Sequence, residues 1–305
     1  MAVQWPLLVF SVLLGISCGI LVFLGIGEIK GAFKRVRFPL ALVALVLLAV
    51  GGCASALHLG HIDRALYILG NPASGLSKEL FAVGFTGIVT LVYVVLCRKD
   101  YPGPTKVFGI LALVGALVLP LVAGASYMMP ARPAWDSFAL PLMYLGTGLG
   151  MGFVFAAAFS AGKLDAGEAK LARTLVLVGV VASAVVMAVY VAWVAMAPHA
   201  DPSRSIDLLL SGSLALPFWL GVVVLGIVCP IALALAAMRG GKGAAVPASA
   251  QPDASGAAVA PAATAAMGVA APLWGAFACL LVGNVVLRVI MYTVATSVEQ
   301  LIYVF

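Results

Sequence analysis

Charged residues are scarce in this sequence. Only 9% of the 305 residues are charged, 64% are hydrophobic, and the mean hydropathy is +1.18. Soluble domains carry about a quarter charged residues, so this chain cannot cover the surface of a soluble globule. The same composition excludes disorder for most of the chain. A polytopic membrane protein fits instead, and the continuous apolar runs disfavour a transmembrane β-barrel, in which polarity alternates.

Cysteine and histidine are also too few, and too dispersed, for common redox cofactors. The sequence has five cysteines, none of them paired at metal-binding spacing, so we expect neither a metal site nor an iron–sulfur cluster. Its histidines, His58, His61 and His199, fall at the ends of apolar segments or between them, so we expect no haem. The sequence has no Walker-type phosphate loop, which disfavours a primary ATP-driven pump. Its basic residues are not interleaved with aromatic ones, which disfavours a nucleic-acid partner.

Eight apolar segments are long enough to cross a bilayer, which takes about 20 residues each. The predicted spans are residues 5–27, 38–59, 79–97, 107–128, 138–160, 174–197, 214–238 and 273–296. The first is not expected to be a cleaved signal peptide, because it lacks a charged leading region and its apolar run is too long. We therefore predict an all-α protein with one integral membrane domain over residues 1–305. Its Ala/Pro/Gly-rich stretch 240–268 is predicted to be a flexible loop.

The distribution of basic residues predicts the orientation. Most of the 17 Lys and Arg residues lie in the odd-numbered loops between the spans, including the clusters around Lys34, Lys99 and Lys170. The positive-inside rule places these loops, with the 240–268 loop, in the cytoplasm. With eight spans, both termini are then predicted on the outer, periplasmic side.

Glycines recur at the spacing that lets helices approach closely in membranes. The predicted packing pairs are Gly15 with Gly19, Gly146 with Gly150, and Gly148 with Gly152. The run 146–150 lies inside a span and follows no strand, so we do not interpret it as a nucleotide-binding loop.

Polar side chains at membrane depth are costly and therefore indicate function. His58 ends the second predicted span and Glu79 begins the third, while Asn284, Arg288 and Tyr292 form one stripe of the last span. Arg288 stands about fifteen residues from the inner end of its span, roughly 22 Å, and so in the outer half of the membrane. We expect these groups to converge near the outer boundary.

A His and a Glu at such a boundary are suited to accepting protons from a lipid-soluble hydroquinone as its electrons leave. The alternative is structural. In that case His58 caps a helix end, Glu79 stands in the first helical turn, where the macrodipole favours a carboxylate, and Arg288 only neutralises a buried acid.

One stretch of sequence resembles a known family. It comprises Ser55-Ala-Leu-His58-Leu-Gly60, then Arg64-Ala65, then Leu76-Ser77-Lys78-Glu79. These residues resemble the membrane anchor subunit of dimethyl sulfoxide reductase. The eight spans, the outward termini, the 132–136 segment Arg-Pro-Ala-Trp-Asp, and the late Arg288 with Tyr292 agree with that resemblance.

The resemblance implies a menaquinol-oxidising anchor in the bacterial inner membrane. Such an anchor binds menaquinol, carries no haem, iron–sulfur cluster or molybdopterin, and holds a four-cluster iron–sulfur subunit and a molybdopterin catalytic subunit at the lipid bilayer. The matching positions make His58 and Glu79 the quinol-site residues, with Arg64 beside them. We expect Gly60, Arg288 and Tyr292 to support that site. The chain departs from the family in its Ala-rich 240–268 loop and in His61.

Two other functions stay open at this stage. The chain is also compatible with the anchor of another quinone-linked reductase, of the polysulfide or nitrite reductase type. A secondary transporter is the other alternative, because Pro217 and Pro230 in the seventh span resemble helix breaks at a transport site. For the anchor, an outer-half quinol site predicts partners on the outer side, since electron transfer needs the quinol close to the first cluster.

Overall fold

The computed structural model is a bundle of long helices. It describes residues 3–57, 67, 70–99, 101–132, 134–196, 207–240 and 260–294, with the backbone alone for residues 240 and 260–267. Within these ranges the chain is helical and has no strand. The helices are α1 (Trp5–Lys30), α2 (Arg37–Ala56), α3 (Gly75–Lys99), α4 (Pro102–Ala125), α5 (Ala139–Ser160), α6 (Ala166–Met196), η2 (Pro217–Val228), α8 (Cys229–Gly240) and α9 (Ala260–Val294).

Eight helices in the described residues are long and apolar enough to cross a membrane, as predicted. The seventh, Pro217–Arg239, combines η2 and α8. Its first part has the wider π-helical geometry, and the chain passes through Cys229 in helical conformation directly into α8. The prolines of this span therefore distort it without breaking it.

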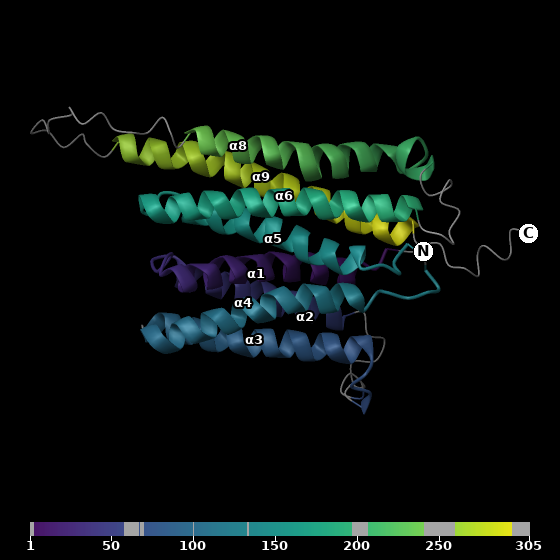
Figure 1. The fold of residues 1–305 in the computed structure, drawn as a ribbon, viewed down its shortest axis with the longest axis horizontal. Coiled ribbons are helices and arrows are strands. Elements are labelled where there is room, and N and C mark those ends of the chain that lie inside the picture. The colour runs from purple at the N-terminus through teal and green to yellow at the C-terminus, as the bar shows by residue number, and fades with distance from the viewer. Residues whose placement is uncertain are drawn as a thin grey trace, which may run out of the picture.

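The helices run side by side, with α1 and α5 in the middle of the bundle (Figure 1). In the most apolar stretch of each, 83% of α1 and 72% of α5 is buried, against 28% of α2. Helices α2, α3 and α4 pack on one side of this pair, and α6, η2, α8 and α9 on the other (Figure 1). A central pair covered on both sides explains why α1 is apolar all round.

Glycines let the two central helices touch. Gly15 and Gly19 of α1 face Gly148 and Gly152 of α5, and a Cβ atom on Gly19 or Gly152 would collide with the backbone of the opposite helix. The predicted packing pairs on α1 and α5 are thus confirmed. The remaining predicted pair faces α6 instead: Gly146 and Gly150.

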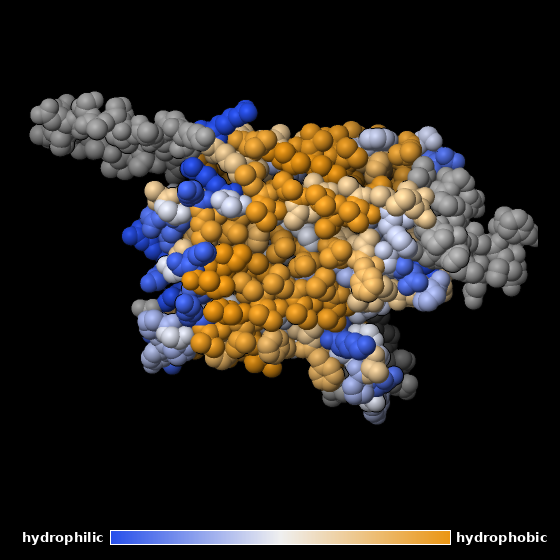
Figure 2. Space-filling view, in the orientation of Figure 1, coloured by the Kyte–Doolittle hydropathy of each residue, from blue (hydrophilic) through white to orange (hydrophobic). Residues whose placement is uncertain are grey.

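The two ends of the bundle differ in polarity. An apolar belt covers the middle of the visible face (Figure 2). Hydrophilic residues gather at the end where α1, α3, α5 and α8 end (Figures 1 and 2). We call this the basic end; among its residues are Lys30, Lys34, Arg98, Lys99, Lys163, Lys170 and Arg239. Helix α1 begins and α9 ends at the opposite end, which we call the terminal end (Figure 1). The side of the membrane that each end faces stays a prediction.

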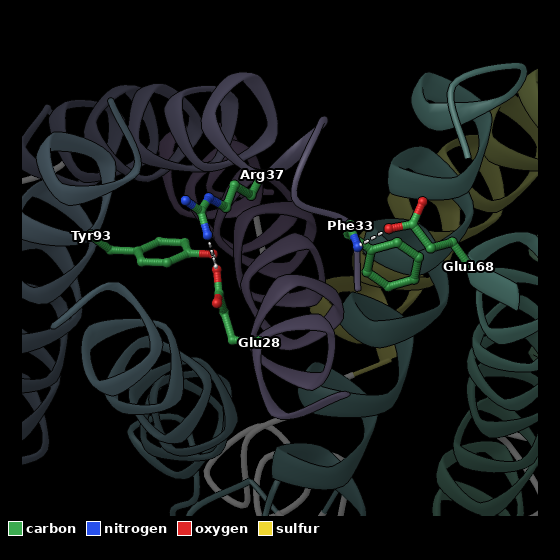
Figure 3. Close-up of polar contacts among 5 residues, drawn as sticks. All are labelled: Glu28, Phe33, Arg37, Tyr93 and Glu168. Carbon is green, nitrogen blue, oxygen red and sulfur yellow. Dashed lines mark hydrogen bonds and ion pairs between the residues drawn. The ribbon is translucent and has the colours of Figure 1, made fainter. Parts of the chain in front are cut away.

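Buried polar contacts join four helices at the basic end (Figure 3). The Tyr93 hydroxyl of α3 donates to Oε1 of Glu28 on α1 at 2.9 Å, and Nη1 of Arg37 on α2 lies 3.7 Å from the same oxygen. The α1–α2 turn is held separately, because Oε1 of Glu168 on α6 accepts the backbone N–H of Phe33 at 2.6 Å. Phe33 has a left-handed φ of 65°, a conformation that costs a residue with a Cβ and needs such support.

Helices α3, α4, α6 and α9 begin earlier than the predicted spans, at residues 75, 102, 166 and 260 in place of 79, 107, 174 and 273. Helix α3 begins at Gly75, because the Ser74 hydroxyl accepts the backbone N–H of Ser77 at 3.1 Å and so caps the new helix end. Helix α9 begins at Ala260, so the last part of the predicted 240–268 loop is helical, as its high alanine content favours. Residues 241–259 of that loop lie outside the described residues.

Candidate functional site at the terminal end

Glu79 is a buried carboxylate near the start of α3. Its side chain is 9% exposed and lies within hydrogen-bonding reach of the Ser126 hydroxyl at the end of α4. The same hydroxyl lies 3.1 Å from the Gly75 carbonyl, which ties the beginning of α3 to the end of α4. Because α3 begins at Gly75, Glu79 lies beyond the first turn. The expectation of a carboxylate in the first turn is therefore wrong, and the macrodipole does not explain this burial.

Four aromatic side chains, two from the α4–α5 connection and one each from α5 and α9, meet beside this carboxylate. Tyr127 follows α4, Trp135 lies in the α4–α5 connection, Tyr144 is on α5 and Tyr292 is on α9. The Tyr292 hydroxyl donates to the Tyr127 hydroxyl at 3.3 Å. The Tyr127 and Trp135 rings meet edge to face at 5.7 Å, as do those of Trp135 and Tyr292 at 5.8 Å. Edge-to-face contacts of this kind fix ring positions as well as burying area.

Trp135 anchors the α4–α5 connection to α9. Its indole N–H donates to the Met291 carbonyl at 3.0 Å. This carbonyl stands in the last turn of α9, where helix carbonyls lack partners within the helix. The Arg132 guanidinium lies over the other side of the connection, 4.7 Å from the centroid of a Trp135 ring. The aromatic cluster therefore depends on contacts between segments far apart in the sequence.

Arg288 is the most unusual group in the site. Its side chain is 1% exposed, and its guanidinium carbon lies 3.3 Å from the centroid of the Tyr144 ring. Its Nε donates to the Asn284 side-chain oxygen at 3.3 Å, and the Asn284 amide nitrogen lies 3.5 Å from the Met151 sulfur. Among the described residues its Nη1 has no hydrogen-bond partner and it makes no ion pair within 4.0 Å. The alternative that Arg288 neutralises a buried acid is thus not seen in the described part of the chain.

Two tyrosine hydroxyls of the site, those of Tyr127 and Tyr144, keep a proton that can be donated in a hydrogen bond. Burial, together with the neighbouring Tyr144 and Tyr292 hydroxyls and Glu79, raises the pKa of Tyr127 well above its usual range, so this tyrosine stays protonated. Its oxygen already accepts from Tyr292, which leaves its own proton for another acceptor. The Tyr144 hydroxyl is buried close to that of Tyr127 and makes no hydrogen bond of good geometry with the described residues.

The structure brings Glu79, Arg288 and Tyr292 to one region at the terminal end. Tyr127 and Tyr292 link these residues, since both lie close enough to Glu79 to interact with its charge, and their hydroxyls contact each other. The other predicted site residues, His58, Gly60 and Arg64, lie outside the described residues.

Sequence reasoning missed three members of the site: Tyr127, Trp135 and Tyr144. The signal for Tyr144 was a tyrosine inside an apolar span, which polar-residue counting alone would have found. Within the described ranges, no three His, Cys, Asp or Glu side chains gather closely enough to hold a metal ion.

Comparisons with known proteins agree with this architecture. The family model for the dimethyl sulfoxide reductase anchor subunit (DmsC) matches residues 1–239. The anaerobic dimethyl sulfoxide reductase chain YnfH of Escherichia coli (strain K12) is 32% identical over 165 residues, which is 51% of this chain and 57% of that relative. The alignment thus spans little more than half of the relative, and α9 with Arg288 lies beyond the family match. The chain, a multi-pass membrane protein, belongs to the family of dimethyl sulfoxide reductase anchor subunits.

Proposed function

We propose that this chain binds menaquinol at the terminal end of the bundle and passes its electrons to an iron–sulfur partner. The observation that carries the proposal is the buried Arg288 cation, which has no counter-ion among the described residues and lies in the same cluster as Glu79. A buried charge without a partner is strongly unfavourable, so this position is suited to a ligand that brings a polar or anionic oxygen. A hydroquinone losing its protons presents such an oxygen.

Each residue has a separate task in this proposal. Oxidation of one hydroquinone to the quinone releases two protons and two electrons. Glu79, together with His58, accepts the protons as general base. Arg288 stabilises the negative charge that develops on the quinol oxygen, and the free proton of Tyr127 holds the oxygen in position. The electrons leave singly for the nearest cluster of the partner.

The aromatic rings are suited to the flat body of the quinol. Tyr127, Trp135 and Tyr292 hold one another edge to face and so form a fixed aromatic wall, against which a bicyclic headgroup would pack. Gly60 and Arg64 complete the site in this proposal, on the resemblance alone.

The complex follows from the same reasoning. We place the chain in the bacterial inner membrane with a four-cluster iron–sulfur subunit and a molybdopterin catalytic subunit docked at the terminal end, near the site. By the positive-inside rule that end faces the periplasm. The anchor family favours these partners over those of a polysulfide or nitrite reductase. The transporter loses its main support, because the seventh span is continuous.

The test compares two electron donors for dimethyl sulfoxide reduction in membranes. A menaquinol analogue must use this chain, whereas a reduced viologen dye feeds the catalytic subunit directly. We expect Glu79→Gln and His58→Ala to lower the quinol-driven rate at least tenfold and to leave the dye-driven rate unchanged. Asp207→Asn, an exposed carboxylate near the beginning of η2, is the matched control and should alter neither rate.

Two outcomes contradict the proposal. Equal loss of both rates in the Glu79 variant would show that Glu79 supports assembly and not quinol oxidation, and an unchanged quinol-driven rate would remove Glu79 from the site. Partner identity is checked by a mild-detergent pull-down of tagged protein. Recovery of the chain alone, without molybdenum and iron, would contradict the anchor function.

A further inference from the structure

Helix α3 carries a buried polar stripe along its length. The stripe consists of Glu79, Thr86, Thr90, Tyr93 and Cys97, at intervals of seven, four, three and four residues, which places them on one face of the helix. All five are buried, whereas the bulky apolar side chains of α3, such as those of residues 85 and 88, are exposed where lipid would surround the bundle. In a bilayer, polar residues are expected to face the bundle interior in this way, and at this depth they indicate function.

The stripe faces the backbone of α4. A Cβ atom built on Gly115 of α4 would lie 2.8 Å from the Thr86 hydroxyl oxygen, and one built on Gly109 would lie 3.0 Å from the Tyr93 ring. Pro120 follows in α4 and cannot donate to the Ala116 carbonyl, one turn back along the helix. The backbone of α4 therefore has one carbonyl acceptor without its helical donor, one residue beyond the Gly115 that meets Thr86.

Three buried threonine hydroxyls on α3 and α4 lack hydrogen-bond partners within the described part of the chain. Thr86, Thr90 and Thr105 are fully buried, and their Oγ1 atoms have no hydrogen-bond partner among the described residues. Threonines elsewhere in the bundle bond back to their own helices, Thr147 to the Met143 carbonyl at 2.6 Å and Thr174 to the Lys170 carbonyl at 3.1 Å. Buried polar groups without a protein partner are normally satisfied by ordered water.

Both ends of the stripe reach a carboxylate. At the basic end the Tyr93 hydroxyl donates to Glu28 (Figure 3). The Cys97 thiol is a further hydrogen-bond neighbour of that hydroxyl. Glu28 in turn pairs with Arg37 at 3.7 Å. At the terminal end the stripe finishes at Glu79, the proposed proton acceptor of the quinol site.

We propose that this stripe, with water between its hydroxyls, is a proton path that links Glu79 to Glu28 across the membrane. Along α3, Thr86, Thr90 and Tyr93 are separated by rises of about 6 and 4.5 Å, which one water spans in each case. The rise of about 10 Å from Glu79 to Thr86 takes two or more waters. Each hydroxyl or water accepts one proton and releases another, so no group changes permanently.

This inference deepens the proposed function, since it gives the Glu79 proton a second route, towards the basic end. Its test needs neither quinol nor partner subunits. Purified full-length chain is reconstituted in liposomes that contain the pH-sensitive dye pyranine, and a potassium gradient with valinomycin imposes a potential. The measured quantity is the proton flux per protein, after subtraction of the flux through protein-free liposomes.

The variants separate a proton path from a packing role. Thr86→Val with Thr90→Val keeps the side-chain shapes and removes both hydroxyls, and we expect the flux to fall at least fivefold. Thr90→Ser keeps the hydroxyl and should retain the wild-type flux. The exposed Thr174→Val is the matched control and should also retain it.

The flux alone decides the inference. Wild-type flux at the protein-free level, or an unchanged flux in the double valine variant, overturns the proton path. Equal loss in Thr90→Ser and in the double valine variant also overturns it, because the hydroxyl survives in the first. None of these results alters the quinol-driven assay, so a failed proton path and a failed quinol site are distinguishable.

Discussion

The guanidinium of Arg288 lies over the ring of Tyr144, with its carbon 3.3 Å from the ring centroid. This contact joins α9 to α5 deep in the bundle and gives a buried cation its main favourable interaction. A desolvated cation–π contact contributes about 2 kcal/mol, which is less than the cost of burying an ion. The ring therefore positions the charge without neutralising it, and the cation is left to act on a ligand.

A first prediction follows from the planarity of this cation. Arg288→Lys keeps the charge but loses the flat group that stacks on Tyr144 and bonds Asn284. We expect the quinol-driven rate to fall about tenfold, as loss of roughly 1.4 kcal/mol implies. Arg288→Met should lower it further, since the charge itself is gone.

The dye-driven rate and the amount of complex in the membrane are measured beside the quinol-driven rate. Arg239→Lys, at the basic end, serves as the control and should match the wild type. If Arg288→Met left the quinol-driven rate at its wild-type value, Arg288 would have no part in quinol oxidation.

A second prediction concerns the hydroxyl pair Tyr127 and Tyr292. Each phenylalanine variant removes one partner of the same 3.3 Å hydrogen bond, so each should lower kcat/KM for the quinol several-fold. Because the two changes remove one shared interaction, kcat/KM of the double variant should be no lower than that of the less active single variant. Kinetics of all four proteins with the quinol analogue check this. Additive losses would show that the two hydroxyls act independently.

A third prediction concerns the contact between the central helices. Gly152→Ala places a methyl group against the backbone of Gly19, and neither backbone can move without repacking the bundle. Overpacking of this kind costs about 1–3 kcal/mol or more. We expect less protein in the membrane and a thermal midpoint several degrees lower in detergent.

Gly84→Ala is the matched change, because a Cβ atom there meets nothing within 4 Å and Gly84 is exposed on α3. It should leave the midpoint unchanged or raise it, since alanine favours the helix by about 1 kcal/mol. Equal midpoints for the two alanine variants would contradict the close approach of α1 and α5.

The sequence was sufficient for the spans and for part of the site, and the reason is physical. Hydropathy over 20 residues determines what crosses a bilayer, and counting residues along a straight helix places Arg288 and Tyr292 on one face of the last span. The glycine pairs of α1 and α5 were likewise visible from spacing alone. These features depend on one helix at a time.

The rest of the site depends on contacts between helices. Nothing in the sequence near Tyr127 indicates that it meets Tyr292, 165 residues later, because that contact arises from Trp135 bonding the end of α9. The start of α3 was missed for a local reason, since the Ser74 cap lies outside the apolar run. Whether His58 acts in the site stays a prediction.

The last prediction concerns the α1–α2 turn, where the Glu168 carboxylate accepts two backbone hydrogen bonds. Glu168 accepts the Phe33 N–H through Oε1 and the Asp165 N–H through Oε2, so it holds the turn and caps α6 together. Hydrogen bonds to a charged group contribute about 1.5–3 kcal/mol to stability. The bond to the Phe33 N–H offsets the cost of the left-handed backbone at Phe33. Glu168→Gln keeps one acceptor oxygen and Glu168→Ala keeps none, so we expect thermal midpoints in the order wild type, Gln, Ala. The exposed Lys170→Ala is the control on the same helix.

Because the turn lies at the basic end, the quinol-driven rate per assembled complex should stay constant across the Glu168 series. A rate that fell with the midpoint would mean that the two ends of the bundle are coupled.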